Sequence, residues 1–166
     1  NGLLVVDMIE LTLRLHKPSD KDLFSEKHFG DNNKRQENSF NPPMEFVSSS
    51  KYPKPKSMNA YPFSMTETVI SLITLQNSSH YIEWKALINK FMTYGFWKGL
   101  LVLYMHLKQI QHCIYLAVLL DSKKPLLDLL CDERDPRLWK ELLQCLIYVR
   151  GIGKPELHTK FYYILF

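Results

Sequence analysis

The run from Tyr94 to Val149 constrains the fold of this chain most, because it reads as one short apolar helix after another. Its leucine-rich segments have helical periodicity, and connections of only a few residues separate them. Helices joined so closely must pack antiparallel, and helices with two apolar faces must stack on one another. The run therefore predicts an all-α fold of antiparallel helical hairpins stacked as an α-solenoid segment, with a compact helical bundle as the alternative.

Capping residues give the expected helix boundaries. Ser64 and Glu67 form a capping box before an apolar run, and Gly95 marks a helix C-terminus. Ser122 and Asp135 each stand just before a helix that has proline in its first turn. These signals predict helices over residues 66–76, 80–93, 96–107 and 109–120, a short helix after Ser122 and a last helix from Pro136.

Three parts are expected along the chain. Residues 1–16 are predicted to be the N-terminal helix of a preceding repeat, with one apolar stripe made of Leu4, Met8, Leu11 and Leu15. Residues 17–65 are rich in Asn, Ser, Lys and Pro, which predicts a long disordered or irregular insertion with a short helix near residues 21–27. Residues 66–166 are predicted to be hairpin repeats. Because the apolar end at residues 161–166 has no cap, we expect a segment cut at both ends from a larger chain.

Composition indicates an ordinary globular chain without a strong bias in partners. The sequence is 46% apolar and 23% charged, and its net charge of +4 is too small to make nucleic acid an expected partner. Cys113, Cys131 and Cys145 make an odd number within apolar helical pattern, which favours buried thiols in a reducing compartment such as the cytosol. Polar residues interrupt the longest apolar window, so no membrane-spanning helix is expected.

Four motifs in the second half resemble a known class of helical repeat. They are YGFWKGLLVLY, LAVLLDS, LLDLLC and DPRLWKELL. This order is similar to the clathrin-heavy-chain-type repeats of large vacuolar and endosomal tethering subunits. Within that group, DSKKPLLDLL resembles the helical half of a subunit of a cytosolic complex that serves the biogenesis of lysosome-related organelles.

The resemblance implies a non-enzymatic scaffold in vesicle trafficking towards melanosomes, platelet dense granules and similar organelles. The implied partners are sibling subunits of a hetero-oligomeric complex, with clathrin and small GTPases as further family partners. The implied location is the cytosol, with at most peripheral association with endosomal membranes. The family contributes no catalytic residues.

One leucine motif resembles a clathrin-box peptide, which binds its receptor as an extended strand. Its residues are Leu126, Leu127, Asp128, Leu129 and Leu130. The motif follows a capped proline start, and its leucines suit a helix interior. Because one sequence cannot occupy an apolar core and an exposed peptide groove together, we expect a structural role for it.

A short basic stretch offers the one exposed motif for contact with an anionic surface. Lys51, Lys54 and Lys56 alternate there with tyrosine and proline. They are candidates for weak contact with anionic lipid or an acidic protein. A solvated linker is the more common meaning of a run with this proline content.

Motifs of catalysis and of cofactor or metal binding are missing from the sequence. It has no phosphate-binding glycine loop, no Cys-x-x-Cys pair, no His-Glu-x-x-His and no Gly-x-Ser-x-Gly. We therefore predict a protein without an enzymatic, cofactor or metal site. The alternative function is that of an independent helical domain that binds peptide or nucleic acid in a groove, using Trp84, Trp97, Trp139 and nearby lysines.

Overall fold

A computed structural model describes residues 2–28, 41–43, 53–75, 83–122, 124, 126, 128, 130, 131 and 135–150. This part of the chain is predominantly helical, so the all-α class is correct, and it also contains one two-stranded antiparallel sheet. The elements are α1 (Gly2–Leu15), α2 (Asp20–Leu23), β1 (Phe24–His28), β2 (Pro53–Pro55), α4 (Phe63–Leu75), α5 (Trp84–Tyr94), α6 (Trp97–His106), α7 (Ile110–Leu119) and α9 (Pro136–Arg150). Residues 124, 126, 128, 130 and 131 are also helical.

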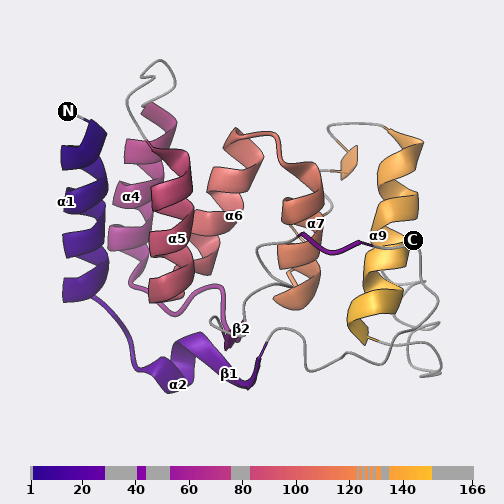
Figure 1. The fold of residues 1–166 in the computed structure, drawn as a ribbon, viewed down its shortest axis with the longest axis horizontal. Helices are drawn as coiled ribbons and strands as arrows, with labels where there is room; N and C mark the ends of the chain where they lie inside the picture. Colours follow the sequence, from indigo (N-terminus) through magenta and orange to yellow (C-terminus); the bar gives the residue numbers. More distant parts are fainter. Residues whose placement is uncertain are drawn as a thin grey trace.

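The long helices lie side by side in a row, with α1 at one end and α9 at the other (Figure 1). Each helix packs mainly against its neighbours: α1 on α5, α5 and α4 on α6, α6 on α7, and α7 on α9. Helices α6 and α7 therefore occupy the middle of the row. On its outer side, α1 has no described helix beside it (Figure 1).

The core is centred on α6 and α7. Six consecutive residues of α7, from Cys113 to Val118, are buried, as expected for a helix that is apolar on nearly all sides. Helix α6 buries a similar share of its length through Trp97, Gly99, Leu100, Leu101, Leu103 and Tyr104. The side chains of α4, α5 and α9 complete this core from both sides.

Three successive helices end in the same way. Gly95 has a positive φ of 66° after α5, which confirms the predicted C-terminal turn. Lys108 and Asp121 have φ values of 55° and 53° after α6 and α7. In each turn the next amide donates to a carbonyl five residues earlier, from Phe96 to Phe91, from Gln109 to Tyr104 and from Ser122 to Ala117, at 2.9 Å in every case. The left-handed residues recur at intervals of thirteen, so α5, α6 and α7 follow one local repeat.

The predicted insertion over 17–65 is not confirmed as disordered, because the residues that the structure describes there include short helical and strand elements. Helix α2 covers part of the short helix expected at 21–27, and β1 follows it directly. Strand β1 pairs antiparallel with β2, although Pro53 and Pro55 stand in the second strand. Residues 29–40 and 44–52 lie outside the described residues.

One backbone carbonyl ties this sheet to the helix row. The Leu23 carbonyl accepts hydrogen bonds from Trp97 Nε1 at 3.0 Å and from the Lys56 amide at 3.1 Å. The Phe24 ring meets the Trp97 indole edge to face, with ring centroids 6.0 Å apart. Tyr61 adds a second tie by donating its hydroxyl to the Tyr94 carbonyl at 2.7 Å. Order in this segment thus comes from α5 and α6, which are distant in sequence.

Two of the predicted caps have definite outcomes. The capping box at Ser64 and Glu67 is wrong, because α4 begins at Phe63 and Glu67 instead pairs with Lys98 at 3.1 Å. The cap at Asp135 is confirmed, since its Oδ1 accepts a hydrogen bond from the Arg137 amide at 2.9 Å. The helix predicted to continue to residue 76 ends at Leu75 within the described residues.

We predict that Gly99→Ala destabilises the fold by about 1–3 kcal/mol, although alanine is the better helix former. A Cβ at Gly99 would lie 2.0 Å from Cε1 of Phe96. The Phe96 ring is buried and packs edge to face against Tyr61 and Phe91, with centroids 5.1 Å away in both pairs, so a shift of the ring would disturb these contacts. Urea unfolding measures the effect. In a Phe96→Leu background the same change should cost less, and a Gly99→Ala protein more stable than wild type would contradict this packing.

Candidate functional site

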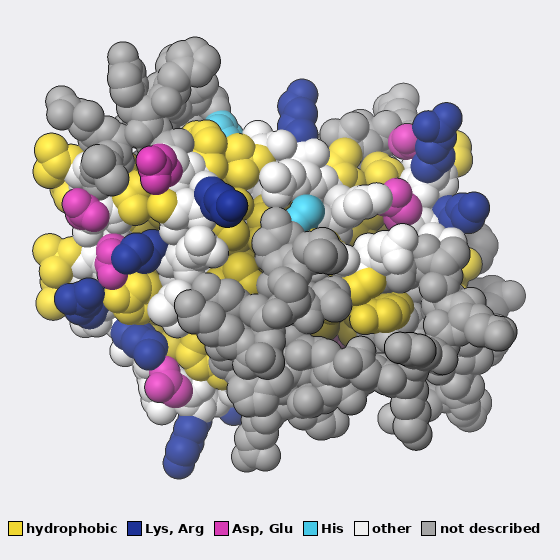
Figure 2. All heavy atoms as spheres, in the orientation of Figure 1, with side chains coloured by type: hydrophobic (Ala, Val, Ile, Leu, Met, Phe, Trp, Pro, Cys, Tyr) yellow, Lys and Arg dark blue, Asp and Glu magenta, His cyan; other side chains and the backbone are white. Residues whose placement is uncertain are grey.

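The outer face of α1 carries four of the seven large hydrophobic side chains that are exposed in the described part of the chain. The stripe predicted from the sequence lies on this face, and its side chains are Leu4, Met8, Leu11 and Leu15, with exposed fractions of 61%, 60%, 56% and 72%. Figure 2 shows hydrophobic side chains gathered along this edge of the molecule, over α1. Contiguous exposed apolar surface on a helix marks an interaction site or an aggregation hazard.

A second apolar stripe holds α1 on the rest of the fold. Val6, Ile9 and Leu13 are spaced by three and four residues, and all are buried. They lie on the opposite side of the helix from the exposed stripe. Sequence reasoning missed this second set, although its spacing is helical, because the first stripe already accounted for the periodicity. Helix α1 therefore has two apolar faces, of which one is in use within the chain.

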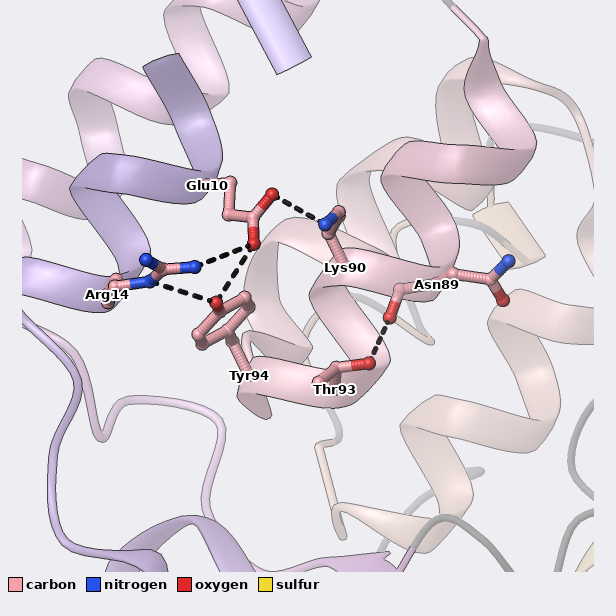
Figure 3. Close-up of polar contacts among 6 residues, drawn as sticks. All are labelled: Glu10, Arg14, Asn89, Lys90, Thr93 and Tyr94. Atoms are coloured by element: carbon pink, nitrogen blue, oxygen red, sulfur yellow. Dashed lines mark hydrogen bonds and ion pairs between the residues drawn. The ribbon is translucent and has the colours of Figure 1, made fainter. Parts of the chain in front are cut away.

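A polar cluster joins α1 to α5 on the flank between these two faces (Figure 3). Glu10 forms ion pairs with Lys90 at 2.5 Å and with Arg14 at 3.3 Å. The Tyr94 hydroxyl donates to Glu10 Oε1 at 3.0 Å and accepts from Arg14 Nε at 3.4 Å. One carboxylate thus meets two cations and one hydroxyl.

The cluster lowers the pKa of Glu10, and its hydrogen bond to Lys90 is the main cause. The same hydrogen bond raises the pKa of Lys90, and the contact with Tyr94 raises the pKa of Arg14. All three shifts favour the charged forms. The Glu10 side chain is 17% exposed, whereas Arg14 is 67% exposed, so solvent screens the outer part of the cluster more strongly.

The basic stretch is described at two of its three lysines. Lys56 is exposed, and its Nζ donates a hydrogen bond to the Lys21 carbonyl at 2.5 Å. The backbone amide of Lys56 donates a hydrogen bond to the Leu23 carbonyl. Lys54 belongs to β2, and Lys51 lies outside the described residues. Lys56 therefore takes part in anchoring β2 to α2.

The clathrin-box-like leucines are described at alternate positions. Leu126 and Leu130 are buried, and Asp128 between them is exposed, which is the pattern of one helix face. Leu127 and Leu129 lie outside the described residues. Two buried leucines four residues apart are unavailable to an extended peptide groove.

The three tryptophans that the peptide- or nucleic-acid-binding alternative would use lie in different parts of the fold. Trp97 is buried. The Trp84 ring contacts the His106 ring at a tilt of 52°, with centroids 5.4 Å apart, and Trp139 packs against the core from α9. The rings of His112 and Tyr104 are tilted relative to each other, and their centroids are 4.8 Å apart. Within the described ranges, no three histidine, cysteine or acidic side chains meet as a metal-binding group, and no helix has the length and apolar character to cross a bilayer.

Comparison with known proteins found no matching family model, no matching curated protein and no matching solved structure.

We expect Glu10→Gln to lower the free energy of unfolding at neutral pH by about 1 kcal/mol, since charged hydrogen bonds at a partly exposed site are lost. Because the folded pKa of Glu10 lies below its ordinary value of 4.5, this stabilisation is complete above that value. It disappears as pH falls through the folded pKa, so wild type and variant should converge at pH values below that folded pKa.

Urea unfolding across this pH range measures the difference between the two proteins. The matched control is Glu67→Gln, because Glu67 also pairs with a lysine but is 48% exposed and receives no tyrosine hydrogen bond in the contacts described. A constant gap between wild type and Glu10→Gln at every pH would contradict the proposed origin of the stabilisation.

We also expect one thiol to react quickly with a thiol reagent in the folded chain and all three after unfolding. Cys131 is exposed, whereas Cys113 and Cys145 are buried. Burial raises the pKa of Cys113 to about 12 and raises that of Cys145 as well, which keeps both thiols protonated at neutral pH. Counting the fast-reacting thiols with and without denaturant checks this, and two or three fast thiols in the native state would show that α7 and α9 do not pack as described.

Proposed function

We propose that this chain is a segment of a non-enzymatic helical scaffold that acts by assembling with other protein chains. The observation that carries the proposal is the apolar outer face of α1, at the open end of a row of helices. In a solenoid, each repeat buries its apolar faces against its neighbours, and an end left apolar needs a further partner. Helix α1 has this property, because its inner stripe is buried and its outer stripe is exposed.

The regular geometry of α5, α6 and α7 supports the solenoid arrangement over a compact bundle. Each of these helices ends in a left-handed residue, and these residues recur every thirteen positions. The main packing partners are neighbours in the row, and α1 and α9 lie at its opposite ends. Repetition along one direction is what distinguishes a solenoid from a closed bundle.

The resemblance of the second half supplies the cellular setting of this proposal. The motifs at residues 94–149 resemble clathrin-heavy-chain-type repeats, and DSKKPLLDLL resembles the Hermansky-Pudlak syndrome 3 protein. On this basis, the scaffold serves vesicle trafficking for the biogenesis of lysosome-related organelles. Its partners are sibling subunits, with clathrin or small GTPases as further partners, and it acts in the cytosol with peripheral association with endosomal membranes.

The alternative of a helical domain that binds peptide or nucleic acid through its tryptophans has less support. Trp97 is buried, and its Nε1 is already bonded to the Leu23 carbonyl at 3.0 Å. An indole held in this way cannot stack on a base or enter a peptide-binding groove.

Affinity purification of the tagged chain from cells tests the scaffold proposal. We expect wild type to retain a stoichiometric set of trafficking subunits, identified by mass spectrometry, and Leu11→Glu to lose them because a charge is placed in the exposed stripe. The matched control is Phe63→Glu, which changes a side chain that is 75% exposed in the first turn of α4. Equal retention by Leu11→Glu and wild type, or the absence of such subunits from all three proteins, would contradict the proposal.

A further inference from the structure

We infer that the outer face of α1 is a homodimer interface, on which α1 of a second copy of this chain docks antiparallel. This inference rests on the proposed use of α1 as an assembly surface: the second copy covers the outer stripe, and the sibling subunits assemble on the dimer that this contact forms. The four exposed side chains follow one another at intervals of four, three and four residues, from Leu4 through Met8 and Leu11 to Leu15. This is the alternation of the a and d positions of a coiled coil, so α1 presents a short seam of two heptads.

The seam is symmetric about its midpoint. Intervals of four, three and four residues read the same in both directions along the helix. An antiparallel copy therefore places Met8 opposite Leu11, and Leu4 opposite Leu15. Each contact then occurs twice around a twofold axis, which gives a closed dimer from one surface.

The charges beside the seam complement each other in this orientation. Asp7 and Arg14 lie on the flank next to α5, and both are exposed. In the antiparallel dimer, Asp7 of each copy lies across from Arg14 of the other copy, so two intermolecular ion pairs form. A parallel dimer would place Asp7 across from Thr12 of the second copy and would gain no ion pair. Charge complementarity thus selects the antiparallel second copy.

The remaining groups at the seam do not oppose docking. Val5 and Thr12 line the other flank without charge, and the Thr12 hydroxyl already donates to the Met8 carbonyl at 2.8 Å. Arg14 uses Nε and one terminal nitrogen within its own chain, and a guanidinium has further N–H groups to offer. Because the buried inner stripe already orders α1, docking does not require a helix to fold.

Sedimentation velocity of the purified 166-residue chain at increasing concentration tests whether the dimer exists. We expect a weak, concentration-dependent monomer–dimer equilibrium, since the seam is short. Leu11→Glu should abolish it, and Phe63→Glu should leave it unchanged. A wild-type chain that remains monomeric at several hundred micromolar would overturn the inference and leave the α1 face to another chain or segment. A dimer that survives Leu11→Glu would overturn it as well.

Charge exchange tests the orientation. Asp7→Arg and Arg14→Asp should each raise the dimer Kd about tenfold, because both ion pairs become pairs of like charge. An equal mixture of the two variants should associate as tightly as wild type, since the flank of one then complements the flank of the other. Fluorescence anisotropy of one labelled variant measures this, and a mixture no tighter than either variant alone would overturn the antiparallel arrangement.

Thermal unfolding followed by circular dichroism must accompany these variants, because Arg14 also contacts Glu10 and Tyr94. The mixing result stands as long as both variants are folded at the temperature of the measurement. A monomeric chain that still captures trafficking subunits through α1 would refute the dimer and leave the scaffold proposal in place. A dimer that captures no trafficking subunits would support the dimer and contradict the scaffold proposal.

Discussion

Burial of α6 and α7 on nearly all sides is the constraint on which the rest of the described fold depends. Helix α6 contacts α4, α5 and α7, and α7 also packs against α9. The helices on both sides of α6 and α7 are therefore connected through these two helices. Full burial of each large apolar side chain, such as Trp97 or Leu100, contributes about 2–3 kcal/mol. The sheet is attached there as well, because the Trp97 indole holds the Leu23 carbonyl. Without α6, the helices on either side of it would have no common surface on which to pack.

Local sequence signals predict α5, α6 and α7 well, because the residues that start and stop them are close in sequence. The expected helix at 96–107 and the observed α6 at Trp97–His106 differ by one residue at each end. The sheet could not be predicted in this way, since its prolines and polar residues are typical of a linker. Strands β1 and β2 are far apart in sequence, and their order depends on Trp97 and Tyr94, which lie further still along the chain. Contacts of this kind have no signature within the segment itself.

The sequence predicts that the candidate site is a helix with an apolar stripe, but it does not predict that this stripe is exposed. Periodicity assigns Leu4, Met8, Leu11 and Leu15 to one face of α1 without telling whether that face lies inside or outside. The same period also fits Val6, Ile9 and Leu13, which are the residues that the core buries. Only the partners of α1 on α5, more than seventy residues later, decide between the two sets. Lys56 and Leu126, which belong to motifs with known functional meanings, contribute to anchoring and to packing in the described fold.

A helix with two apolar faces needs something other than burial to fix its rotation about its own axis. Half a turn would exchange the inner and outer stripes of α1 at little cost in apolar area, because both consist of aliphatic side chains of similar size. Such a rotation would carry Glu10 away from Lys90 and Tyr94 and would leave these groups without their present partners. The Glu10 cluster therefore selects one rotation, even though partly exposed ion pairs add little stability. It also places Arg14 and Asp7 beside the outer stripe, so the contacts that seat α1 on α5 determine which apolar face is available for assembly.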